Sequence, residues 1–120
     1  MEMKIFIDQF NSSHIGVYFD LGNSLLNGYP EHWISLLGNH IKAIHVKNFN
    51  RDDCAGVLHG FGESLKEGDL DYEKIKKTLS MINYRGPLTV EMIPFSRLPD
   101  LVLPDMDLAR KVSKELLEIF

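Results

Sequence analysis

The chain has 120 residues, of which 44% are hydrophobic and 25% charged, and its formal net charge is −4. This acidic balance argues against a protein that binds the nucleic-acid backbone, because such a protein needs a basic face. No apolar run approaches the roughly 18 residues of a membrane span and no signal peptide is evident, so we expect a cytoplasmic protein without membrane partners. A single cysteine, Cys54, excludes an internal disulfide framework.

The first half of the chain alternates strand-like and helix-like segments. Residues 4–10 fit either a strand or the tail of a helix. Residues 14–20 (HIGVYFD) are rich in β-branched and aromatic residues and predict a strand that the following Leu-Gly-Asn ends. A helix is expected from Pro30 to Gly38, since proline favours the first helical turn and glycine follows helix ends. Residues 41–46 (IKAIHV) predict a second strand.

The second half begins with a polar, glycine-containing stretch over residues 47–68. Asp71 is a suitable N-cap for a helix whose apolar residues recur at helical spacing up to Ile82. A third strand is expected over residues 88–93 (LTVEMI), followed by a loop over 94–104 and a last helix over 105–118. The apolar stripe of that helix consists of Ala109, Val112, Leu116 and Ile119.

Strands that alternate with helices indicate βαβ units and a parallel sheet. The order here is β-α-β-α-β-α, in which each connection between parallel strands is expected to be right-handed. The predicted fold class is therefore α/β, with helices covering at least one face of a three-stranded parallel sheet.

Three polar residues share one side of this predicted sheet. Side chains alternate between the two faces of a strand, and in each strand one face carries more apolar residues than the other. Asp20, His45 and Glu91 all lie on the less apolar face, and each is at or near the C-terminal end of its strand. That end is where α/β folds hold their ligands. Two carboxylates and an imidazole suit a divalent cation such as Mn²⁺, Mg²⁺, Co²⁺ or Zn²⁺. The alternatives are that Asp20 is a cap, that His45 is a core histidine and that Glu91 is an ion-pair partner of a basic neighbour.

Four segments together resemble a known family: GVYFDLGN (16–23), IKAIHVKNF (41–49), GDLDYEKI (68–75) and NYRGPLTVEM (83–92). In order and spacing they resemble the C-terminal part of the sugar phosphate isomerase/epimerase family, which has the xylose isomerase-like TIM-barrel fold. The resemblance implies that residues 1–120 form a single truncated barrel domain. Its three strands would then match the last three strands of the barrel.

The resemblance also implies roles for individual residues. Asp20, His45 and Glu91 match metal ligands, and Glu91 matches the ligand that is also the catalytic acid/base. Arg51 and Asn23 match positions near the substrate. The residue after Lys47 is Asn48, where the family often has an acid. Independently of the resemblance, Lys47 is a candidate for contact with a substrate phosphate or oxygen, the alternative being a solvated loop lysine.

The function expected from these features is a metal-dependent sugar or sugar-phosphate isomerase or epimerase, or the C-terminal part of one. It would act by proton transfer next to a metal-polarised ketose carbonyl. The resemblance implies a fourth ligand, a Glu on a preceding strand that also serves as the second acid/base group, and this chain does not contain it. The alternative is therefore a non-catalytic remnant or interaction subunit from a truncated or split gene. An endonuclease IV-like nuclease is disfavoured by the acidic charge.

Three strands of a barrel leave two unpaired edges and an open inward face, which another polypeptide is expected to cover. The partners expected are therefore a small sugar or sugar-phosphate substrate and either further copies of this chain or a complementing N-terminal half-barrel chain.

Overall fold

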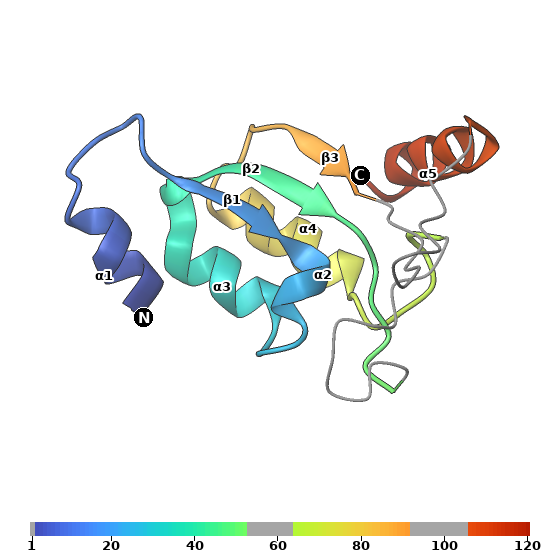
Figure 1. Cartoon of the computed structure of the whole chain (residues 1–120), viewed down its shortest axis with the longest axis horizontal. Helices are drawn as coiled ribbons and strands as arrows, with labels where there is room; N and C mark the ends of the chain where they lie inside the picture. Colours follow the sequence, from blue (N-terminus) through green and yellow to red (C-terminus); the bar gives the residue numbers. More distant parts are fainter. Residues whose placement is uncertain (1, 53–63, 92–105) are drawn as a thin grey trace, which may run out of the picture.

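The computed structural model describes residues 2–52, 64–91 and 106–120. Strands β1 (Val17–Asp20), β2 (Ile41–Val46) and β3 (Leu88–Val90) form one parallel sheet in the order β1-β2-β3 (Figure 1). This confirms the α/β class and the three parallel strands. The first strand begins three residues later than predicted, and its pairing with β2 shifts register between Val17 and Tyr18. The third is followed directly by Glu91, and the end predicted at Ile93 lies outside the described residues.

All three predicted helices are present, and the described residues form further helices besides them. The helices of the described residues are α1 (Glu2–Asp8), α2 (Leu21–Ser24), α3 (Pro30–Leu37), the 3₁₀ turn η1 (Gly38–His40), α4 (Tyr72–Met81) and α5 (Met106–Ile119). Helix α1 decides the ambiguous segment 4–10 in favour of a helix. Helix α2 was not predicted, and it forms because the Asp20 carboxylate accepts a hydrogen bond from the Asn23 amide as its N-cap.

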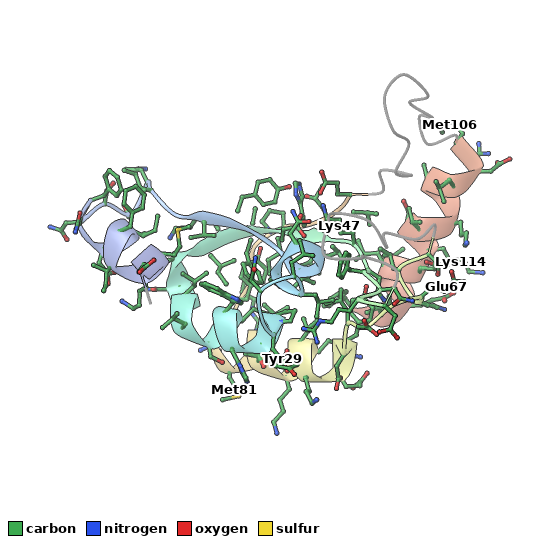
Figure 2. The ribbon with its side chains drawn as sticks, turned by 60° about the horizontal axis from the view of Figure 1, so that its bottom comes forward. Tyr29, Lys47, Glu67, Met81, Met106 and Lys114 are labelled. Carbon is green, nitrogen blue, oxygen red and sulfur yellow. The ribbon has the colours of Figure 1, made fainter. Side chains whose placement is uncertain are left out.

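Helices α3 and α4 pack together and cover one face of the sheet (Figure 1). The core between them contains Phe19, Ile44 and Val46 from the strands, and Ile34 and Ile75 from the helices, all buried. The strand residues in this core belong to the predicted apolar set, so the opposite set faces the uncovered side. Figure 2 shows Lys47 on that side, away from Tyr29 and Met81 near the helices.

Helix α5 buries most of the predicted stripe. Val112 is buried, and Leu116 and Ile119 pack against the core as predicted. Ala109 is exposed, and Leu108 packs against the core instead. Glu115 is also buried on this helix, because its carboxylate accepts hydrogen bonds from the Ser64 hydroxyl (3.0 Å) and the Leu65 amide (2.7 Å).

The segment after β2 is held by the buried side chain of Asn48. Its amide donates to the Leu65 carbonyl (2.7 Å), and its oxygen accepts from the Phe49 (2.8 Å) and Leu70 (3.1 Å) amides. Gly68, with φ of 133°, lies against this side chain, and a Cβ there would clash with the Asn48 oxygen. One asparagine thus links three points of the chain. The predicted loop 94–104 and Cys54 lie outside the described residues.

Across the described ranges, no helix has both the length and the apolar character that crossing a membrane requires.

Candidate metal centre

The three predicted ligands come from the C-terminal ends of the three strands. Asp20 is the last residue of β1 and pairs in register with His45 of β2. Glu91 follows β3, and its amide donates to the Val46 carbonyl at 3.1 Å, which continues the ladder by one residue. The parallel register therefore brings side chains separated by 71 positions in the sequence to one edge, as the alternation of side chains predicted.

Ligand atoms of Asp20, His45 and Glu91 all lie within 4.8 Å of one another. The His45 Nδ1 atom is 3.7 Å from Asp20 Oδ2 and 3.5 Å from Glu91 Oε2. The other Asp20 oxygen, Oδ1, accepts the Asn23 amide hydrogen at 2.8 Å and thereby orients the carboxylate. The side chains of the three residues are 15–29% exposed, so the group is accessible from solvent.

These residues fit a divalent cation. Two carboxylates and one imidazole converge within ligand reach, and their donor atoms suit Mn²⁺, Co²⁺ or Zn²⁺, with Mg²⁺ favoured less by the nitrogen. The negative charge of two carboxylates at one site also favours a dication electrostatically.

Lys47 lies in the same cluster. Its Nζ atom is 2.6 Å from Glu91 Oε2 and 3.0 Å from Asp20 Oδ2, and its side chain is only 9% exposed. The hydrogen bond from this ammonium holds the pKa of Glu91 below its ordinary value, with further help from the charge of His45 and against the opposing effect of burial. Glu91 is therefore ionised at neutral pH.

The lowered pKa of Glu91 predicts a pH dependence of stability in the metal-free protein. Ionised Glu91 contributes stability that is fully present above its unfolded pKa, near the ordinary 4.5, and is lost as the pH falls through the lower folded pKa. We expect urea unfolding in EDTA to show this loss in the wild type and a smaller one in Glu91→Gln. An equal acid dependence in both proteins would contradict the assignment.

Tyr18 was not singled out by sequence reasoning, although its parity placed it on the side of Asp20. Its ring stacks on the His45 imidazole with centroids 4.1 Å apart and planes tilted by 47°. The stacking restricts the orientation of the imidazole. Because Tyr18 itself is 53% exposed, the pair forms part of the open inward face of the sheet.

Of the other two predicted site residues, Asn23 lies near the cluster and Arg51 does not. Asn23 lies beside Asp20, and both line a shallow hollow of about 250 Å³ along β1. Arg51 is not brought to the cluster in this structure. Its guanidinium donates to the carbonyls of Leu25 (3.0 Å) and Gly28 (2.5 Å) and lies 5.0 Å from the centroid of the Tyr29 ring.

Comparisons with known proteins agree with this architecture. The family model described as xylose isomerase-like TIM barrel matches residues 1–116. A solved structure, a xylose isomerase domain protein from Planctomyces limnophilus, superposes with a TM-score of 0.68 at 24% identity. The match covers 95% of this chain and 38% of that one, so the chain spans well under half the length of its structural relative. No curated protein matches the chain.

Proposed function

Because the chain belongs to the family of xylose isomerase-like TIM barrels, we propose that it forms the metal-binding part of a sugar or sugar-phosphate isomerase or epimerase. The observation that supports this most directly is the convergence of Asp20, His45 and Glu91 at the C-terminal edge of three parallel strands. In barrels of this kind the reactions take place at that edge.

The residues would divide the work as follows. Asp20, His45 and Glu91 would hold a divalent cation, which when bound polarises a substrate carbonyl. The Glu91 carboxylate, ionised at neutral pH, would accept the proton from the carbon next to that carbonyl and return it. Asn23, which lies beside the cluster, and Lys47, which lies within it, would contact the substrate oxygens.

The test is exchange of a substrate proton with solvent. The protein is incubated in D₂O with Mn²⁺ and a panel of ketoses and ketose phosphates, and deuterium next to the carbonyl is followed by NMR. We expect incorporation with the wild type and none with Glu91→Gln. If Mn²⁺ binds but no substrate of the panel exchanges, the chain is better described as the non-catalytic remnant or interaction subunit.

We also propose that a polypeptide carrying further barrel strands covers the inward face. In the sheet β1-β2-β3 the outer strands each have one edge without a neighbour among the described strands. Beside β1, α1 presents Met3 and Phe6, which are 46% and 55% exposed and line a hollow of about 580 Å³ together with Trp33. An apolar surface next to an unpaired strand edge favours association. The match covers 38% of the structural relative, and this difference in length supports the proposal.

Without that polypeptide, the chain alone is expected to self-associate at micromolar concentration through the apolar surface of α1 beside β1. Light scattering after gel filtration should show association for the wild type and less for Phe6→Asn. Met81→Asn is the matched control, because Met81 is an exposed apolar residue (71%) on α4. A monomeric wild type that unfolds cooperatively would contradict the proposal.

A further inference from the structure

The side chain of Lys47 reaches the centre of the proposed metal site from the strand that supplies His45. Lys47 lies two positions after His45 and one residue past the end of β2. Its Nζ atom contacts Asp20 Oδ2 at 3.0 Å and Glu91 Oε2 at 2.6 Å. One ammonium thus joins the carboxylates of two different strands.

The oxygens that Lys47 contacts are the ones that face the histidine. Asp20 Oδ2 and Glu91 Oε2 are also the carboxylate atoms nearest to His45 Nδ1, at 3.7 and 3.5 Å. The ammonium and a divalent cation would therefore use the same two oxygens. Metal–oxygen bonds of about 2.0–2.5 Å are shorter than these hydrogen bonds, so both cations cannot share the oxygens without strong repulsion.

Burial makes this competition effective. The Lys47 side chain is 9% exposed and that of Asp20 is 15% exposed, so water screens their attraction only partly. The ammonium neutralises one of the two carboxylate charges and keeps the carboxylates close together when no other cation is near. Removal of its charge would leave two carboxylates and an imidazole at one point, which is a stronger site for a dication.

We propose that the Lys47 ammonium is a built-in competitor of the divalent cation, and that metal binding displaces it from the Asp20 and Glu91 carboxylates. The inference rests on the proposed metal site and adds to it a residue that sets the metal affinity. The displaced ammonium stays near the C-terminal end of β2 and can then contact a substrate oxygen or phosphate. This is the role for which the sequence makes Lys47 a candidate.

The test is Mn²⁺ affinity measured by calorimetry in the wild type and in Lys47→Met, which keeps most of the side-chain volume without the charge. We expect Lys47→Met to bind Mn²⁺ about tenfold more tightly, which lies within the range of ordinary coupling energies in proteins. Lys47→Arg keeps a cation and should bind no more tightly than the wild type. Lys42→Met is the matched control, because Lys42 is an exposed lysine of β2 that contacts the Asn39 carbonyl, and its affinity should be unchanged.

Stability supplies a second readout that does not depend on activity. In EDTA, Lys47→Met should unfold at lower urea than the wild type, and Mn²⁺ should restore more stability to it than to the wild type. If Lys47→Met folds only with Mn²⁺, that result supports the proposal. If Lys47→Met does not fold without Mn²⁺, Lys47→Arg still tests the proposal. Tighter Mn²⁺ binding by Lys47→Arg than by the wild type would contradict competition between the side-chain cation and the metal.

The outcomes separate the two proposals. If the wild type binds Mn²⁺ and Lys47→Met binds it equally or more weakly, the competitor role is wrong while the metal site stands. If neither protein binds Mn²⁺, Co²⁺ or Zn²⁺, the proposed metal site fails and the competition fails with it.

Discussion

Replacing His45 by alanine is expected to weaken Mn²⁺ binding by about 100-fold or more, since even residues that only orient a metal ligand contribute 10–100-fold. His45 is the nitrogen donor of the cluster, and its Nδ1 lies within 3.7 Å of one carboxylate oxygen of Asp20 and one of Glu91. Without it, Asp20 and Glu91 still bind the Lys47 ammonium, which then competes more effectively with the metal for the two carboxylates. Calorimetry with Mn²⁺ measures the change.

His40→Ala provides the matched control for this measurement. The His40 side chain is 25% exposed and that of His45 is 29% exposed, but His40 lies at the opposite end of β2 and pairs with Asp8 at 2.9 Å. Its removal should leave Mn²⁺ affinity unchanged. Equal affinities for the wild type and His45→Ala would show that the cluster is not the metal site.

Replacing Asn48 by alanine is expected to lower the free energy of unfolding by about 2–4 kcal/mol, which is the range for a broken buried hydrogen-bond network. Asn48 is 3% exposed, and its removal would leave the Leu65 carbonyl and the Phe49 and Leu70 amides without this partner. Asn39→Ala, the same change at an exposed position, should change the free energy by less than about 0.5 kcal/mol. Urea unfolding in EDTA compares the two.

Asn48→Asp tests why an asparagine occupies this position. An ionised carboxylate accepts from the two amides but cannot donate to the Leu65 carbonyl, whereas the protonated acid can. Burial would raise the pKa of the new carboxyl, so the stability it contributes when protonated should be lost as the pH rises through that pKa. We therefore expect this variant to lose stability relative to the wild type between acid and neutral pH. A constant difference would contradict the donor role.

The placement of Asp20, His45 and Glu91 on one edge could be predicted because it depends on local features. Alternation along each strand decides the face, and the ends of parallel strands meet at one edge. The N-cap at Asp71 was predictable for a similar reason, since the cap and the amide it accepts are three residues apart. The α2 turn after Asp20 escaped prediction because it is only four residues long and depends on one capping bond.

Other features depended on partners far away in the sequence. The apolar pattern of α5 predicted Val112, Leu116 and Ile119, but the burial of Glu115 depends on hydrogen bonds from Ser64 and Leu65, about 50 positions away in the sequence. Arg51 has a long side chain with many rotamers, and in the structure its guanidinium donates to two carbonyls after β1, which the sequence did not predict.

The 120-residue sequence by itself determined the α/β class, the three parallel strands and the edge that gathers two carboxylates and an imidazole. These follow from periodicity and strand ends, which are short-range properties of the chain. Only the tertiary structure decided that the Lys47 ammonium lies between the Asp20 and Glu91 carboxylates, 44 positions separating Lys47 from Glu91. The physical reason is that a flexible cation takes the position where folded strands concentrate negative charge, and that position exists only after the strands have paired.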